Sequence, residues 1–219
     1  MIATGKNLLT PTEAAVVASV SVRNVNRAID EKILPKNLFE MGTDGARRLS
    51  ADACIFISFY FEAANRLTSE ERLRIIATAS KQLQEETMSA LEEEWTIRQE
   101  FLTVDLAPFL RGVRQRLAKL NTARELVVED PGILSGTPVI RGTRVPVYYV
   151  AASVEAGESM ACILDSYSSL TAEDVELAAL YAKAIPPRGR PSPSRSLPVG
   201  AVIVASYSVP RRQRLKQAS

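Results

Sequence analysis

Residues 8–35 determine the fold expected for the first part of the chain, and they read LLTPTEAAVVASVSVRNVNRAIDEKILP. Two short helical patterns stand on either side of a tight break. Thr10 or Thr12 can cap the first helix and Ser21 the second, because a hydroxyl oxygen accepts from a free N–H of the first turn. In the second pattern Val22, Val25 and Ile29 share one side and leave a polar side with Arg23, Asn24, Asn26 and Arg27. We predict a helix-turn-helix with a polar reading face.

The next stretch predicts a hairpin beside these helices. Residues 36–49 read KNLFEMGTDGARRL, and Asp-Gly between two short apolar-containing runs is a hairpin signal. We interpret it as a wing whose Arg47 and Arg48 meet DNA phosphate. Ser50 then caps an apolar helix over residues 51–65, expected to be the core helix or a dimer surface of a first domain, residues 1–65.

Residues 66–125 are expected to be a helical scaffold or dimerisation segment. Thr68 and Glu71 have the spacing of a capping box and open a long helix through about residue 90. A strand-like run over 95–104 precedes an amphipathic helix over roughly 106–121. The segment contains no pattern typical of a chemical site.

The block 126–185 contains the string GTPVIRGTRVPV at residues 136–147. We predict short strands at 139–140 and 145–147, joined by a turn at 141–144 into a hairpin. Three helices should follow, over about 148–156, 160–166 and 172–184, the last two capped by Ser159 and Thr171. This predicts a second unit that is similar to a helix-turn-helix. The expected fold is therefore mainly α with small β-hairpins.

The tail, residues 186–219, differs in charge and composition. From Leu177 to the end there are eight bases and no acid. Of the 27 bases of the chain, 19 therefore lie in residues 1–176, together with all 25 acids. Residues 186–195 are rich in proline, glycine and serine, which predicts a disordered, extended linker. The apolar, β-prone run 197–204 beyond it predicts a segment that pairs with another protein's sheet or groove.

Composition argues against catalysis. The chain has no histidine, which removes the commonest general base and metal ligand. Its two cysteines, Cys54 and Cys162, have no cysteine nearby and are expected to be buried reduced thiols. We predict no enzyme activity, no catalytic residue, no metal and no cofactor. A signal peptide and a membrane span are both lacking, which predicts a cytoplasmic protein without a membrane partner.

Two resemblances rest on these motifs. Residues 10–29 resemble the winged helix-turn-helix of MerR-like proteins and excisionases, through Thr10, Glu13, Ala14 and Ala15 and then Ser21, Val22, Arg23, Val25, Arg27 and Ile29. Residues 130–181 resemble a small antitoxin family with the signature GxPVIxGTRVPV, followed by a tyrosine-led helix motif that Tyr167, Leu170, Thr171, Glu173, Asp174, Val175, Ala178 and Tyr181 match. The whole arrangement resembles VapB-like type II antitoxins.

These resemblances imply a function, partners and site residues. The implied function is a transcription repressor that binds operator DNA and inhibits a PIN-like ribonuclease toxin, as a homodimer within a toxin–antitoxin hetero-oligomer. The DNA-binding residues would be Ser21, Arg23, Asn24, Asn26, Arg27, Arg47 and Arg48. The antitoxin motif would comprise Gly136, Pro138, Ile140, Arg141, Gly142, Thr143 and Arg144. The toxin-binding residues would be Arg188, Arg190, Leu197, Val202, Val204, Arg211 and Arg212, with arginines that approach the nuclease carboxylates.

Simpler interpretations stay open at each of these sites. The polar side of the second helix can be a solvated surface, and the tail can serve solubility alone. Residues 141–144 can satisfy a tight turn, contact DNA or contact a second protomer. The main alternative function is a ligand-sensing transcriptional regulator without a toxin. A nuclease ranks third, because it would need clustered carboxylates. Glu173 and Asp174 fit capping and helix-surface roles, so only Asp165 is left.

Overall fold

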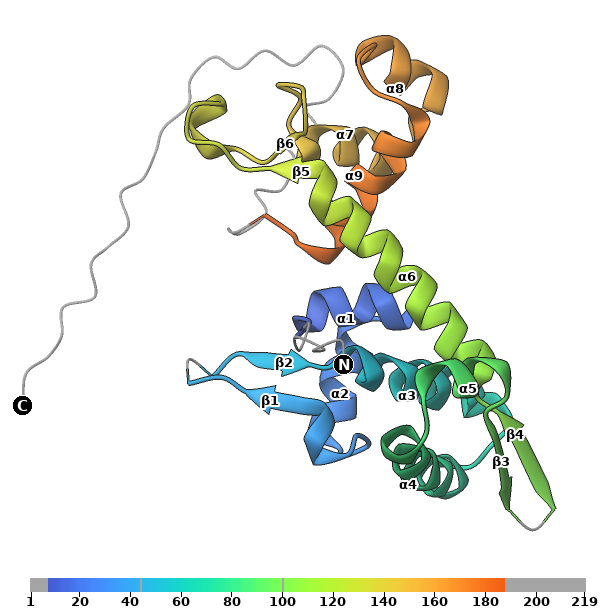
Figure 1. The fold of residues 1–219 in the computed structure, drawn as a ribbon. Coiled ribbons are helices and arrows are strands. Elements are labelled where there is room, and N and C mark those ends of the chain that lie inside the picture. The colour runs from blue at the N-terminus through green and yellow to red at the C-terminus, as the bar shows by residue number, and fades with distance from the viewer. Residues whose placement is uncertain (1–7, 44, 100, 188–219) are drawn as a thin grey trace, which may run out of the picture. The chain divides into compact units, whose positions relative to one another are not determined.

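The computed structural model describes residues 8–43, 45–99 and 101–187, and within them it confirms a mainly helical fold with small hairpins (Figure 1). The helices are α1 Pro11–Ala18, α2 Val22–Asp30, α3 Ala51–Glu62, α4 Ser69–Glu85, α5 Met88–Glu93, α6 Ala107–Leu126, α7 Val147–Glu155, α8 Met160–Ser166 and α9 Ala172–Ala184. Short 3-10 turns lie at Lys36–Leu38, Ala63–Asn65 and Leu134–Gly136. Each sheet has two antiparallel strands: β1 Phe39–Met41 with β2 Arg47–Leu49, β3 Thr96–Gln99 with β4 Leu102–Asp105, and β5 Val127–Val128 with β6 Val139–Ile140.

The predicted helix-turn-helix and wing are present. Thr10 caps α1 and Ser21 caps α2, and between them Ser19 takes a left-handed φ of 58°, which turns the chain. β1 and β2 pair over three positions, and Gly45 supplies the positive φ of 75° that their connection needs. Val22 was expected on the packed side and is 38% exposed. Val22 is the first residue of α2, and the packed side of the helix begins only at Val25 and continues through Ile29.

One apolar cluster joins the first predicted segment to the middle one. Phe56 and Phe59 of α3 meet Trp95 and Phe109 edge to face, with ring centroids 6.1 and 5.6 Å apart. Burial of such aromatic side chains is a large favourable term in folding. The boundary predicted between residues 65 and 66 therefore falls inside a shared core, to which α1, α2, α4 and α6 also contribute.

The middle segment differs from its predicted outline in three places. The long helix stops at Glu85, because Glu86 is extended and Thr87 begins α5 by accepting from the backbone N–H of Ala90. The strand-like run is a hairpin rather than one strand, with Ile97 paired to Val104. The following helix, α6, continues to Leu126, so it is longer than predicted.

The three helices predicted in block 126–185 are present, and the predicted hairpin is present in shortened form: Val139 bridges Pro146, and Ile140 N and Val147 N donate to the Val145 and Pro138 carbonyls, each at 3.0 Å. Because Val147 already begins α7, this contact stays an isolated bridge, and the strand partner of β6 is β5, which was not predicted. α7, α8 and α9 enclose a second apolar cluster, which α6 joins through Ala123. Ser159 and Thr171 cap α8 and α9 as predicted. No helix of the described ranges has the length and apolarity to cross a membrane.

Candidate nucleic-acid interface

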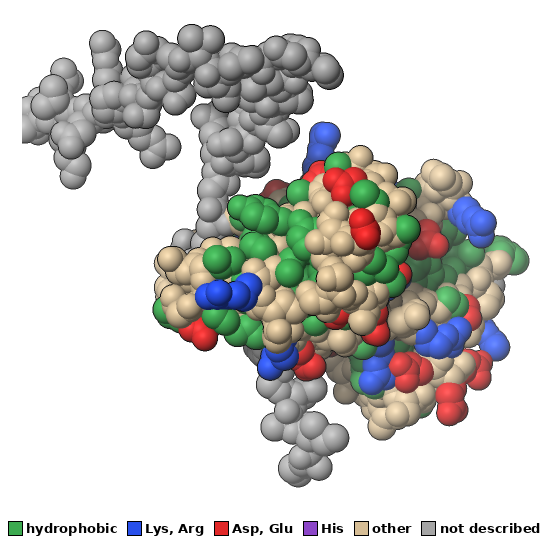
Figure 2. All heavy atoms as spheres, turned by 90° about the horizontal axis from the view of Figure 1, so that it is seen from above, with side chains coloured by type: hydrophobic (Ala, Val, Ile, Leu, Met, Phe, Trp, Pro, Cys, Tyr) green, Lys and Arg blue, Asp and Glu red, His purple; other side chains and the backbone are tan. Residues whose placement is uncertain are grey.

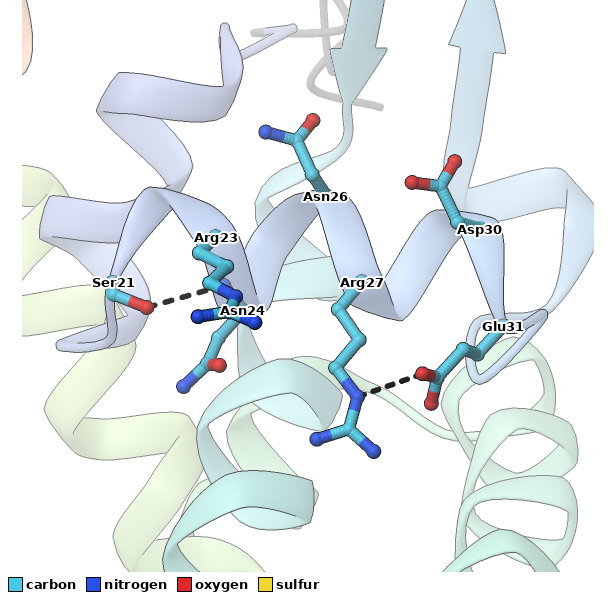
Figure 3. Close-up of a pocket in the computed structure, with 7 residues that line it drawn as sticks. All are labelled: Ser21, Arg23, Asn24, Asn26, Arg27, Asp30 and Glu31. Atoms are coloured by element: carbon cyan, nitrogen blue, oxygen red, sulfur yellow. Dashed lines mark hydrogen bonds and ion pairs between the residues drawn. The ribbon is translucent and has the colours of Figure 1, made fainter.

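The exposed side of α2 is the candidate interface, and Figure 3 shows the side chains along it. Ser21 holds the start of the helix, since its Oγ accepts from the Asn24 backbone N–H at 3.1 Å. Asn24, Arg27 and Glu31 extend to one side of α2, while Asn26 and Asp30 lie on the other (Figure 3). The set therefore presents two polar rows separated by the helix backbone.

Arg47 of the wing is tied to α2. Its guanidinium donates to Asn26 Oδ1 at 2.9 Å and to Asp30 Oδ1 at 2.7 Å. These bonds link β2 to successive turns of α2, so they fix the position of the wing beside the exposed side of that helix. Arg48 donates to the Arg47 carbonyl at 3.2 Å, which adds support along the same strand.

The two arginines of α2 differ in their surroundings, because Arg27 makes internal contacts and Arg23 faces solvent. Arg27 donates to Glu31 at 2.8 Å and lies 6.0 Å from the Phe61 ring centroid. Arg23 is exposed, and within the described ranges neither its guanidinium nor the half-buried Asn24 amide has a partner. Both belong to the first turn, the part of a recognition helix that reaches base edges.

Behind the interface, a buried carboxylate holds α1 to α6. Glu13 is 7% exposed, and its Oε2 accepts from Thr10 N and Oγ1 at 2.8 and 2.9 Å while its Oε1 accepts from Arg124 at 2.8 Å. Burial raises the pKa of Glu13, but the bonds from Arg124 and Thr10 outweigh it and leave the pKa below the ordinary 4.5. The group is therefore a charged anchor of the helix that packs against α2.

Residues of the second motif mostly stabilise their own turn. Ile140 is buried, Gly136 and Gly142 have φ of 83° and 75°, and the Thr143 hydroxyl donates to the Ile140 carbonyl at 2.8 Å. Arg141 Nε donates to the Glu125 carbonyl at 2.9 Å. The Pro138 carbonyl accepts from Val147 N at 3.0 Å. Arg144 is exposed and, in the described part of the chain, makes no side-chain bond.

The remaining predicted residues fall into two groups. The toxin-binding residues Arg188, Arg190, Leu197, Val202, Val204, Arg211 and Arg212 lie outside the described residues. Among the acids, Asp165 is exposed and Asp174 closes a capping box with Thr171. Within the described ranges no group of three or more His, Cys, Asp or Glu side chains could hold a metal ion. Cys54 is buried as expected, whereas Cys162 is exposed, which corrects that prediction.

Sequence reasoning missed Asp30 and Glu31 as members of this surface. A signal was available, because each follows a predicted reader, Asn26 and Arg27, by four residues and so lies on the same helix row. The bond from Arg47 to Asp30 had no comparable signal, since it depends on where the wing folds back.

The fold and this surface define a winged helix-turn-helix protein with a second, small helical unit. Residues 127–182 match the family described as protein of unknown function DUF433. Over 211 residues the chain is 51% identical to the uncharacterized protein y4eO of Sinorhizobium fredii strain NGR234, and the match covers 94% of this chain and 95% of y4eO. The chain belongs to the family of y4eO and contains a DUF433 domain.

A comparison with solved structures found the crystal structure of Rv2018 from Mycobacterium tuberculosis. The two are similar with a TM-score of 0.35 and 19% sequence identity, over 78% of this chain and 96% of Rv2018.

Proposed function

We propose that this protein is the antitoxin of a type II toxin–antitoxin pair, which represses its own operon by binding DNA and neutralises a PIN-like ribonuclease. The observation that carries the DNA-binding part is the first turn of α2, where Arg23 is exposed and has no partner among the described residues, while Arg47 fixes the wing against the same helix. Arginine and asparagine are the side chains that pair bidentately with guanine and adenine edges.

In this proposal the polar residues of the interface have different roles. Arg23 and Asn24 contact base edges, while Arg47 positions the wing, because its charge is already matched by Asp30. Arg48, which donates to a carbonyl and has no ion pair among the described residues, meets phosphate. A homodimer places two α2 helices in successive major grooves, about one helical turn apart.

The toxin-binding part rests on the resemblance of the DUF433 segment to antitoxins and on the sequence of the tail. The last 43 residues of the chain, 177–219, contain eight bases and no acid. Charge-assisted pairs between arginine and carboxylate are strong, so such a tail can compete for the acidic metal site of a nuclease. The protein then acts by binding alone and needs no catalytic residue or cofactor.

Two measurements test the proposal. Fluorescence anisotropy with the protein's own promoter fragment should give specific binding that weakens steeply with salt. Co-expression with the product of the adjoining reading frame should give a complex that inhibits its ribonuclease activity, and a chain that ends at Pro187 should lose that inhibition. A full-length protein that binds neither the promoter fragment nor this product contradicts the proposal, and promoter binding without a protein partner favours the ligand-sensing regulator instead.

A further inference from the structure

Exposed apolar side chains are spread over several parts of the surface. Among the described residues Phe101, Tyr149 and Met41 are the most exposed of the large ones, and the face shown in Figure 2 also carries hydrophobic side chains among charged and other groups. Exposure alone therefore does not select a docking surface. Phe101 differs from the others in its setting, because it is fully exposed and directly precedes β4, whose residues line an apolar groove.

This groove, the β4 groove, lies between the β3–β4 hairpin and the helices α3 and α6, and its volume is about 510 Å³ (Figure 1). Phe59, Leu67 and Phe109 form part of its apolar wall. All four residues of β4, Leu102–Asp105, line it, although successive side chains of a strand point to opposite faces. The groove therefore opens along the outer backbone edge of β4.

That edge of β4 offers backbone groups to a further strand. The Leu106 N–H donates to the Trp95 carbonyl at 2.7 Å, so these two residues form a hydrogen-bonded pair that continues the register of the hairpin. Because hydrogen-bonded pairs alternate along an antiparallel ladder, Thr103 and Asp105 belong to the other pairs and direct their N–H and C=O groups away from β3. In the described part of the chain these groups make no backbone bond elsewhere. Such an edge is a template for strand addition.

We propose that β4 of a second copy of this chain occupies this edge, antiparallel to the first, so that two hairpins form one four-stranded sheet. The proposal goes beyond the proposed function, which needs a homodimer but assigns no surface to it. The register that uses the outward groups of both strands pairs Thr103 with Asp105 of the partner subunit, and Asp105 with Thr103 of the partner subunit. Since the same two residues meet in both directions, the interface has twofold symmetry.

The positions of Phe101 and the groove favour a second copy over an unrelated partner. A protruding aromatic side chain and an apolar groove lie on one hairpin, and a twofold interface requires a patch that is complementary to itself. In this register Phe101 lies across from Ala107 of the partner subunit, at the start of α6, where Phe109 lines the same groove. Each copy thus brings its aromatic ring to the apolar groove of the other.

Charge is also complementary across the twofold axis. Arg98 lies opposite Thr103 within the hairpin, and it is exposed without an ion pair in the described ranges. Directly opposite residues share a face, so Arg98, Thr103 and Asp105 of the partner subunit lie in one row across the sheet. Two strand spacings are about 10 Å, which the long side chain of an arginine and the carboxylate span together. The dimer therefore gives each Arg98 an acid.

The test is sedimentation velocity of the full chain without DNA or a toxin, with circular dichroism to verify that each variant folds. Thr103→Pro removes an outward N–H that the hairpin does not use, and proline is tolerated on an edge strand. Thr96→Pro is its matched control, because the N–H of Thr96 points to the opposite edge of the same hairpin. Phe101→Ala removes the protruding ring, and Tyr149→Ala removes an exposed ring of α7 as its control.

We expect a dimer whose Kd rises about tenfold or more in Thr103→Pro and in Phe101→Ala and changes less than about twofold in the two controls. A wild type that stays monomeric up to about 0.1 mM overturns the inference. So does a folded Thr103→Pro or Phe101→Ala variant that dimerises as tightly as the wild type. The promoter and toxin assays judge the proposed function separately, and a dimer held by another surface leaves that proposal standing.

Discussion

The Glu13 carboxylate offers the sharpest test of how the helix-turn-helix is held to the rest of the protein. Glu13→Ala removes the acceptor for the Thr10 N–H and one of the two side-chain acceptors of Arg124. The bond from Arg124 to Asn121 remains. Loss of a capping interaction costs about 1 kcal/mol, and loss of a hydrogen bond between charged groups about 1.5–3 kcal/mol. Because Arg124 is partly open to solvent, with 28% of its side chain exposed, we take the lower part of that range.

The expected loss is therefore about 2–3 kcal/mol, which corresponds to a fall in Tm of roughly 4–12 °C for a chain of this size. Thermal unfolding followed by circular dichroism measures it. Glu71→Ala is the matched control, since Glu71 forms the same capping box with Thr68 at an exposed helix start, where solvent screens the charge of the nearby Arg74. Its Tm should fall much less. Equal falls in the two variants would refute the reasoning, because Arg124 would then add nothing.

The same residue predicts a pH dependence. The pKa of Glu13 is lower in the folded chain than the ordinary 4.5, so the folded state favours the charged form. That stabilisation is present above pH 4.5 and is lost as the pH falls through the lowered pKa. The stability difference between the wild type and Glu13→Gln should accordingly shrink on acidification, and a constant difference from pH 7 to pH 3 would contradict it.

Three further predictions concern the exposed face of α2 and the two thiols. Arg23→Ala should weaken promoter binding by roughly tenfold or more and relax base preference at one position, as measured by anisotropy on variant sites. Arg47→Ala should weaken binding through a displaced wing, while the slope of affinity against salt changes by clearly less than the one unit expected for a phosphate contact, because Asp30 already pairs with Arg47. Burial raises the pKa of Cys54 to about 12, so iodoacetamide at pH 8 should label only Cys162 in the folded protein and both thiols after denaturation, as read by intact mass.

Elements with a local cause could be predicted from the sequence. Each capping hydroxyl accepts from the backbone N–H three residues later, so Ser21, Ser50, Ser159 and Thr171 located helix starts directly. For the first helix the sequence left Thr10 and Thr12 as alternatives, and Thr10 is the cap. The hairpin of the wing was equally local, because its turn needs a residue such as Gly45 that accepts a positive φ. Because such signals act between residues that are close in sequence, they do not depend on tertiary packing.

Pairings between distant residues could not be predicted in this way. Val139 and Ile140 are β-prone, but nothing in the local sequence shows that Val127–Val128 joins residues 145–147 as their partner. The outcome depends on α6, which ends at Leu126 and places β5 beside β6, and on α7, which begins at Val147 and limits the local hairpin to one bridge. A short strand takes the neighbour that tertiary packing supplies, and its propensity alone does not choose one.

The different contacts of the two arginines of α2 also depend on tertiary packing. Arg23 and Arg27 are identical in type, four residues apart and on one helix, so the sequence assigns both to the reading face. The structure separates them through neighbours that periodicity does not specify: Glu31 and the Phe61 ring of α3 engage Arg27, whereas nothing in the described residues engages Arg23. Arg47 is separated from Arg48 by its contact with Asp30 across 17 positions of chain. Under the proposed function, which cations remain available for DNA is thus decided by the acids at the end of α2 and by contacts from the wing and α3, so a substitution at Asp30 or Glu31 should alter this surface as directly as one at an arginine.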